Sequence, residues 1–176
     1  CFVIMGTAAR VAGPVNTDRF DRRLMNCTHV LDNCYQYIGA INGVGSALRW
    51  IRDTFGQLEQ QEADRNGGNV YDLITAQTAG SPPGSKGLLF LPYLAGERTP
   101  IWDPYARGVF FGVTLGHSRG DIFTSVLEGA AFAINHVIEL LEKDMELEIN
   151  DLHIGGAAAS SPVWNQIIAN VVNKRV

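Results

Sequence analysis

Residues 87–128 read GLLFLPYLAGERTPIWDPYARGVFFGVTLGHSRGDIFTSVLE, and this stretch decides the fold. It begins with an apolar run, Leu88–Leu91, that predicts a buried strand, and Val109–Leu115 predicts another. Ser118, followed three residues later by Asp121, has the form of a capping box, which marks the start of a helix. The apolar face of that helix consists of Ile122, Val126, Ala130, Ala133, Val137 and Leu141. The requirements of a fold alone do not explain this specific order of residues.

The chain upstream of this stretch opens with strands. Residues 2–15 hold two apolar runs around a Gly–Thr break, which predicts a β-hairpin, and Asn26–Leu31 predicts a third strand. From Val44 to Phe55 apolar residues recur at helical spacing, and Gly56 stands where a C-terminal cap would. The opening is therefore predicted as strand, strand, strand, helix.

Two further regions complete the pattern. Residues 57–86 are polar and rich in Gly, Asn, Gln and Pro, which predicts a surface excursion with one short helix at Val70–Ala79. Leu152–Ile154 predicts a strand that breaks at Gly155–Gly156, and Ser161–Pro162 predicts the N-cap and first residue of a last helix. Strands that feed helices after a hairpin indicate an α/β domain.

Composition narrows the class of partner. The 176 residues suit one domain, and 46% hydrophobic with 18% charged content is typical of a globular protein. A net charge of -4 without a dense Lys/Arg run argues against nucleic acid or an anionic membrane, and no stretch approaches the roughly 18 apolar residues of a membrane span. Cys1, Cys27 and Cys34 fit neither a disulfide framework nor a zinc pattern, and the four histidines lack ligand spacing. We therefore expect reduced thiols, no metal site, and small molecules or proteins as partners.

Glycine-containing turns are the candidate ligand sites. Gly6–Thr7 lies at the hairpin turn, where a residue without a side chain lets backbone N–H groups face an anion; a purely structural turn is the alternative. Gly155–Ala157 follows a strand and precedes a helix, where the backbone either approaches a nucleotide or simply turns tightly. Gly45 begins a helix that carries Arg49, a cation that either meets a ligand or is solvated or ion-paired.

The charged loop residues are interpreted as structural. Glu97–Arg98 and Asp103 sit between two Pro-marked turns, and we expect a buried or half-buried ion pair that holds an irregular loop. Glu128 falls near the apolar face of the long helix, so we expect a carboxylate that bonds backbone N–H groups and not a catalytic base. Trp164 is expected in the core, whereas Trp102, in the charged loop, is the aromatic residue to test for stacking on a ligand.

The opening stretch resembles the FGGY family of carbohydrate kinases. The resemblance rests on GLLFLPYL, on GERTPIWDPYARG, and on Gly108-x-Phe110-x-Gly112-Val113, then seven residues, Asp121-Ile122, two residues, and Ser125–Glu128. It implies an actin-like ATPase (ribonuclease-H-like) fold, with residues 1–176 as the incomplete second domain of a two-domain sugar kinase. The N-terminal domain and a final C-terminal segment would then be absent from this chain.

The resemblance also assigns part of an ATP site to this domain. It implies nucleotide contacts by Gly6, Thr7, Gly45, Arg49, Gly155, Gly156, Ala157 and Ser160. Ala8–Ala9 departs from the Ser–Gly that usually follows Gly–Thr in the family, which predicts weaker phosphate binding. The family's catalytic Asp lies upstream of the Gly–Thr turn, and the acidic residues that organise Mg lie in the first domain. No catalytic residue and no metal ligand are therefore expected in this chain.

The expected function is part of a cytoplasmic, ATP-dependent carbohydrate kinase with Mg as cofactor. GERTPIWDPYARG most resembles the xylulokinase and gluconokinase branches, which places xylulose first and gluconate second as the phosphate acceptor. The complete protein is expected to bind ATP or ADP and a small sugar, with a homodimer as one arrangement, and the fragment alone is expected to be inactive. The alternative is a non-catalytic domain kept for nucleotide binding or subunit contact.

Overall fold

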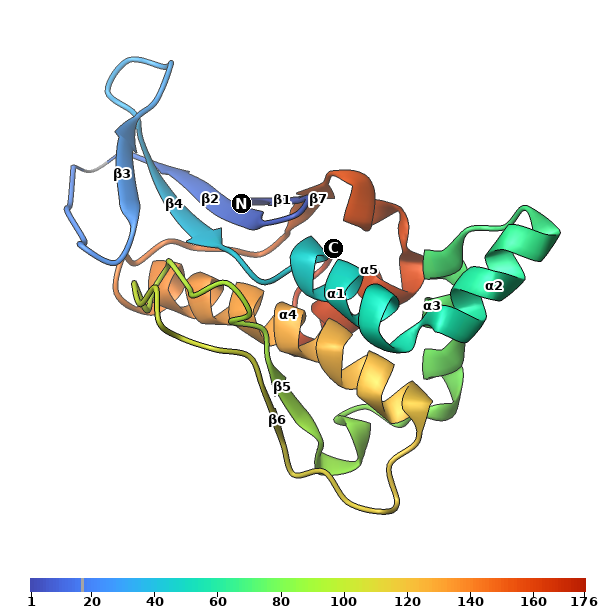
Figure 1. Ribbon diagram of the computed structural model, residues 1–176. Helices are drawn as coiled ribbons and strands as arrows, with labels where there is room; N and C mark the ends of the chain where they lie inside the picture. The colour runs from blue at the N-terminus through green and yellow to red at the C-terminus, as the bar shows by residue number, and fades with distance from the viewer. Residues whose placement is uncertain (17) are drawn as a thin grey trace.

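The computed structural model describes residues 1–16 and 18–176. Figure 1 shows the longest helix, α4, lying between a five-stranded sheet and a separate two-stranded sheet. The strands are β1 (Phe2–Met5), β2 (Ala9–Val15), β3 (Met25–Thr28), β4 (Tyr35–Ile41), β5 (Leu89–Leu91), β6 (Val109–Phe111) and β7 (His153–Gly155). The helices are α1 (Gly45–Phe55), α2 (Gln57–Asn66), α3 (Val70–Gln77), α4 (Arg119–Lys143) and α5 (Pro162–Val172), with 3-10 turns η1 (Thr78–Gly80), η2 (Ser85–Gly87) and η3 (Ala157–Ser160).

The five-stranded sheet brings two glycine turns to one edge. Its strand order is β3-β4-β2-β1-β7, in which β1 and β2 form the predicted antiparallel hairpin and β7 lies parallel to β1. Ile4 is opposite Gly155 in that parallel pair. Because parallel strands end at the same edge of a sheet, the turn that starts at Gly6 lies beside the turn that starts at Gly156.

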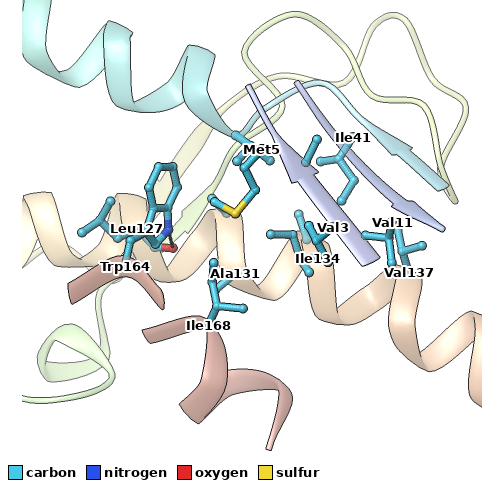
Figure 2. Close-up of a cluster of buried hydrophobic side chains, with 14 of the residues drawn as sticks. Val3, Met5, Val11, Ile41, Leu127, Ala131, Ile134, Val137, Trp164 and Ile168 are labelled. Atoms are coloured by element: carbon cyan, nitrogen blue, oxygen red, sulfur yellow. Dashed lines mark hydrogen bonds between the residues drawn. The ribbon is translucent and has the colours of Figure 1, made fainter. Parts of the chain in front are cut away.

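The core is centred on α4. On the sheet side, Val3 lies over Ile134, and both side chains are fully buried (Figure 2). Trp164 of α5 packs on another side of the helix, and its indole N–H donates to the carbonyl oxygen of Leu127 at 3.2 Å. Burial on several sides explains why α4 carries apolar residues beyond its single predicted face.

Both helices with predicted capping signals begin at those signals. The Ser118 N–H and hydroxyl donate to Asp121 at 2.7 Å each, and the Asp121 N–H donates to the Ser118 hydroxyl, which completes the capping box of α4. Ser161 accepts a hydrogen bond from the N–H of Trp164, and Pro162 is the first residue of α5. Local signals therefore define both helix starts.

Asp121 also ties the segment before β5 to α4. Its carboxylate is fully buried and accepts from the Ser81 hydroxyl at 2.8 Å and from the Lys86 ammonium at 2.9 Å. The hydrogen bonds from Ser118, followed by that from Lys86, hold the pKa of Asp121 well below its usual range. The group is thus a charged anchor and not a proton donor.

Glu128, two helical turns further along α4, binds the same segment. It accepts from the Gly84 N–H at 2.7 Å and from the Ser85 hydroxyl at 2.6 Å, which confirms the predicted structural carboxylate. Ser85 and Lys86 have φ angles of 48° and 55°, a region that non-glycine residues rarely occupy. The two carboxylates of α4 hold this unfavourable turn in place.

The two-stranded sheet has one buried face and one exposed face. Phe90 lies 4.7 Å from Phe110 and 6.0 Å from Trp50, measured between ring centroids, and Trp50 and Phe90 are nearly parallel. Leu89 and Leu91 point the other way and are half exposed. The prediction of a strand here is confirmed, but the prediction that it is wholly buried is wrong, because only one face of β5 meets a helix.

Two elements were not predicted. Strand β4 contains Gly39, where an added Cβ would lie 2.2 Å from Val137 of α4, so close packing of the strand on the helix requires a glycine inside it. Helix α2 falls in the predicted surface excursion, and it has no apolar stripe; Glu59, buried on its inner side, pairs with Arg119 at 2.6 Å.

The predicted strands at 26–31 and 109–115 are confirmed with shorter bounds. Among the described residues, no helix combines the length and the hydropathy needed to cross a membrane.

The aromatic contact between the two-stranded sheet and α1 gives a stability prediction. Replacing Phe90, which is 4% exposed, by Ala is expected to lower the free energy of unfolding by about 3–5 kcal/mol, because a large buried ring leaves a cavity. Phe111→Ala, on the exposed face of the same sheet, is the matched control and is expected to cost about 0.5 kcal/mol or less. Urea unfolding measures both; equal losses would contradict the assignment of the two faces.

Candidate functional site

A cavity of about 560 Å³ opens where the glycine turns meet α1, α3 and α5. Six of the eight residues predicted to contact ATP line it: Gly6, Thr7, Gly45, Arg49, Ala157 and Ser160. The remaining lining residues, several of them from α3, were not predicted to contact a ligand. They are Leu48, Asn69, Tyr71, Asp72, Thr75, Ala158, Ser161 and Trp164. The segments that contribute lie around one region of the fold in Figure 1, although they come from both ends of the chain.

The Gly6–Thr7 turn is docked on the start of α1. The N–H groups of Gly45 and Ser46 donate to the carbonyl oxygens of Gly6 and Thr7, at 3.2 and 2.8 Å. These bonds satisfy N–H groups that a helix start otherwise leaves open. A Cβ on Gly45 would lie 2.2 Å from the Gly6 oxygen, so the close approach of turn and helix itself requires glycine at position 45.

Gly6, in contrast, is not required by packing. A Cβ added there would meet only the carbonyl oxygen of Ala8, at 3.9 Å, and its φ is not in the left-handed region. The residue is exposed on the cavity wall. The fold would therefore accept a side chain at this position, and any need for glycine here must come from what the cavity binds.

Arg49 places a positive charge next to this turn. Its guanidinium donates to the Thr7 hydroxyl at 3.5 Å, and no carboxylate of the described residues lies within ion-pair distance of it. The salt-bridge alternative for Arg49 is therefore not seen among the described residues, and the same geometry leaves its charge available to an anion in the cavity.

Gly155 and Gly156 lie outside the cavity lining. Gly155 pairs with Ile4 inside the sheet, while Gly156 has φ 99° and would place a Cβ 2.3 Å from the carbonyl oxygen of Met5. Glycine at position 156 is therefore needed for the turn from β7 into η3. Through that turn, Ala157 and Ser160 reach the cavity wall.

The opposite wall is formed by α3 and α5. Asn69 caps α3 by accepting the N–H of Tyr71 at 3.0 Å, and the Tyr71 hydroxyl accepts from Arg52 of α1 at 2.7 Å. Trp164 and Thr75 are buried between these helices and the core. This wall combines apolar surface with polar groups at its rim.

The charged loop that follows β5 lies away from this cavity. Glu97 is 4% exposed, and its Oε1 accepts the N–H groups of Asn42 and Arg98 at 2.7 Å each, while the Arg98 guanidinium donates to the Asn42 side chain at 2.8 Å. The predicted ion pair in this loop is therefore wrong: among the described residues Glu97, Arg98 and Asp103 form no ion pair, and backbone N–H groups bind the Glu97 carboxylate instead. Asp103 joins Glu97 through backbone hydrogen bonds at 2.9 Å, which confirms the structural interpretation of the loop.

Trp102 does not point to a ligand site in this arrangement. Its indole N–H donates to the carbonyl oxygen of Arg23 at 2.7 Å, which links the loop to the segment before β3. None of the described residues form a cluster of three or more His, Cys, Asp or Glu side chains suited to a metal ion.

Comparisons with known proteins agree on one family. The profile described as the FGGY family of carbohydrate kinases, C-terminal domain, matches residues 2–176. The gluconokinase of Bacillus subtilis is 34% identical over 175 residues, which are 99% of this chain and 34% of that protein. A xylulose kinase of Staphylococcus epidermidis is 31% identical over 89% of this chain and 29% of its own length.

Solved structures give the same result for the fold. Ligand-bound xylulose kinase from Lactobacillus acidophilus superposes with a TM-score of 0.85 at 27% identity, over 99% of this chain and 34% of that one. Gluconate kinase from the same organism gives a TM-score of 0.84 at 28% identity, over 99% and 34%. The chain thus spans about a third of the length of the relatives that it matches, and the predicted actin-like α/β fold is confirmed.

Burial of Glu97 gives a pH prediction. Burial is the largest cause that raises its pKa, ahead of the backbone hydrogen bonds from Asn42 and Arg98 that lower it. The folded state then holds the proton more tightly than the unfolded state, so this group makes stability fall as pH rises from the unfolded pKa to the folded one. Glu97→Gln is expected to remove that fall.

Urea unfolding between pH 4.5 and 8 measures the difference between the wild-type and Glu97→Gln profiles. Glu62→Gln, on the exposed side of α2, is the control and should keep the wild-type profile. A constant difference between wild type and Glu97→Gln across this range would show that Glu97 has no raised pKa.

Proposed function

The chain belongs to the FGGY family of carbohydrate kinases, as its C-terminal domain, and on that premise we propose that it supplies part of the ATP site of a sugar kinase. The observation that carries the proposal is the convergence of six residues of the predicted ATP site on one cavity. They come from three segments, the turn after β1, helix α1 and the 3-10 turn η3, and only the fold brings these together.

The chemistry of the turn end of the cavity suits a polyphosphate. Arg49 offers a positive charge that no described carboxylate pairs, and Thr7 offers a hydroxyl, beside a glycine that packing does not require. Cations and hydroxyls are the groups that hold phosphate oxygens, and a missing side chain lets phosphate approach the backbone. The phosphates are therefore proposed to lie over Gly6–Thr7.

The proposed reaction transfers the γ-phosphoryl group to a sugar hydroxyl. The hydroxyl oxygen bonds to the γ-phosphorus while the bond from phosphorus to the bridging oxygen breaks, ADP leaves, and the hydroxyl proton passes to a base. That base, Mg and most sugar contacts are proposed to come from the remainder of the protein, since this chain spans about a third of its relatives. Its own residues bind and orient the nucleotide.

Xylulose and gluconate are the proposed acceptors. The residues of the charged loop favour xylulose, whereas the relative with 34% identity is a gluconokinase and one with 31% is a xylulose kinase. The two sugars differ in that gluconate carries a carboxylate. A residue that binds this carboxylate would lie outside the cavity described above, because that cavity is proposed to bind the nucleotide.

Activity of the complete protein tests the function. ADP release is measured with Mg and ATP across a panel of xylulose, ribulose, gluconate and glycerol. A strong response to one sugar is expected, and it identifies the acceptor. A folded protein that binds ATP but responds to no sugar would point to a non-catalytic nucleotide-binding domain.

The contrast between two glycines tests the nucleotide site independently of the sugar. Gly6→Ala is expected to leave the unfolding midpoint unchanged, because the added methyl group meets no close atom, yet to weaken ATP binding about tenfold or more by crowding the phosphates. Gly45→Ala is expected to destabilise the fold itself, because its Cβ would overlap the Gly6 oxygen.

Calorimetric titration of ATP and thermal unfolding measure both effects. Gly80→Ala is the matched control, since its added methyl group also meets open space but lies outside the cavity. A stably folded Gly6→Ala variant with wild-type ATP affinity would show that the phosphates do not lie over this turn.

A further inference from the structure

The two ends of the cavity carry opposite charge. Arg49 is the cation and Asp72 the carboxylate among the described residues that line it. Arg49 lies at the Gly6–Thr7 turn, whereas Asp72 lies in the first turn of α3. No ion pair and no hydrogen bond to the Asp72 carboxylate joins it to another described residue, so its oxygens are available at the cavity wall.

Helix α1 spans the cavity from the Gly6–Thr7 turn to α3. Its first residue contacts the Gly6 carbonyl, and Arg52, seven residues later, contacts the Tyr71 hydroxyl of α3. At 1.5 Å per residue the two contacts are about 10 Å apart along the helix axis. A nucleotide extended from its terminal phosphates to its base spans a comparable length.

Charge fixes which end of a nucleotide lies where. A helix start such as that of α3 would attract phosphate through its N–H groups, but Asp72 places a negative charge in that first turn. Arg52 also reaches this end through Tyr71, but its charge is paired with Asp53 at 2.6 Å. A polyphosphate is therefore repelled by Asp72 and attracted to Arg49. The nucleoside is therefore left to the α3 end.

The cavity also has apolar surface for a flat base. Leu48, Ala158 and Trp164 contribute apolar wall, and the Trp164 indole N–H is already used by the carbonyl oxygen of Leu127. The Thr75 hydroxyl is likewise used, donating to the Asp72 carbonyl oxygen at 3.0 Å. The Asp72 carboxylate thus stands as an acceptor at the rim of a mostly apolar wall.

We propose that Asp72 is a specificity-determining residue that accepts a hydrogen bond from a donor group of the nucleoside, while the phosphates lie toward Arg49. The donor is a ribose hydroxyl or the exocyclic amine of adenine, since an ionised carboxylate accepts from either. This inference rests on the proposed function, because it requires that the cavity binds a nucleotide.

Titration of the complete protein with ATP and with inorganic tripolyphosphate tests the inference. Asp72→Ala is expected to weaken ATP binding about tenfold, the loss of a charge-assisted hydrogen bond, and to leave tripolyphosphate binding no weaker than in the wild type. Asp64→Ala, which removes an exposed carboxylate from α2 outside the cavity, is the control and should change neither affinity. Thermal unfolding of each variant checks that it folds.

Modified nucleotides identify the donor. If a ribose hydroxyl is read, 2′-deoxy-ATP or 3′-deoxy-ATP binds the wild type more weakly than ATP, and this penalty disappears in Asp72→Ala. If the amine donates the hydrogen bond, the 6-oxo nucleotide ITP binds the wild type more weakly than ATP, and this penalty disappears in Asp72→Ala. Both results support the inference.

Two results would overturn it. Wild-type ATP affinity in a folded Asp72→Ala variant, or equal weakening of ATP and tripolyphosphate, would remove Asp72 from nucleoside recognition while the proposed function stands. Failure of the wild-type protein to bind ATP at all would instead overturn the proposed function, and this inference with it.

Discussion

The rest of the structure depends on the burial of α4. The sheet, α1, α3, α5 and the segment before β5 all pack on this helix, so few of its positions face water. A helix in that position can keep polar side chains only where each finds a partner. Asp121 and Glu128 meet this constraint by binding the turn at Ser81–Lys86, which joins two parts of the chain about 40 residues apart. Their positions in the family pattern therefore have a structural cause.

Close approach of backbones is the second constraint, and it falls on glycines. Gly39 lets β4 press on α4, Gly129 lets α4 press on β5, and Gly45 lets α1 meet the hairpin turn. In each case an added Cβ would lie within 2.3 Å of a neighbouring atom. These contacts set the spacing between layers, and hence the shape of the cavity between α1, α3 and η3. Gly6 lines the cavity without such a close contact, which is why it is informative about a ligand.

The sequence predicted the parts of the fold that local signals define. The hairpin of residues 2–15, the capping box at Ser118 and the N-cap at Ser161 were all placed correctly, because their signals lie within a few residues. Strand β4 was missed because the glycine inside it is explained only by its contact with the distant Val137. Helix α2 was missed because it has no apolar stripe, although its Gln, Glu, Leu and Ala residues favour a helix.

The candidate site shows the same division. The turns around Gly6 and Gly156 were marked by glycine and by the family resemblance, so six predicted residues line the cavity. The wall from α3 was not predicted, because Asn69 and Asp72 carry no motif and reach the cavity only through helix packing. In the charged loop, the carboxylate of Glu97 was placed in a structural role, but its partners proved to be backbone groups, which no side-chain pattern encodes.

The docking of the hairpin turn on α1 has a consequence for how an anion would be received. The carbonyl oxygens of Gly6 and Thr7 point at the start of α1, and across a trans peptide the next N–H points the opposite way. The N–H groups of Thr7 and Ala8 are therefore oriented away from the helix, with the carbonyl dipoles already neutralised behind them. An anion that arrives at this side meets donors without first having to rotate a peptide group. The turn is preorganised, because its peptide groups reach the orientation that an anion needs during folding and not during binding.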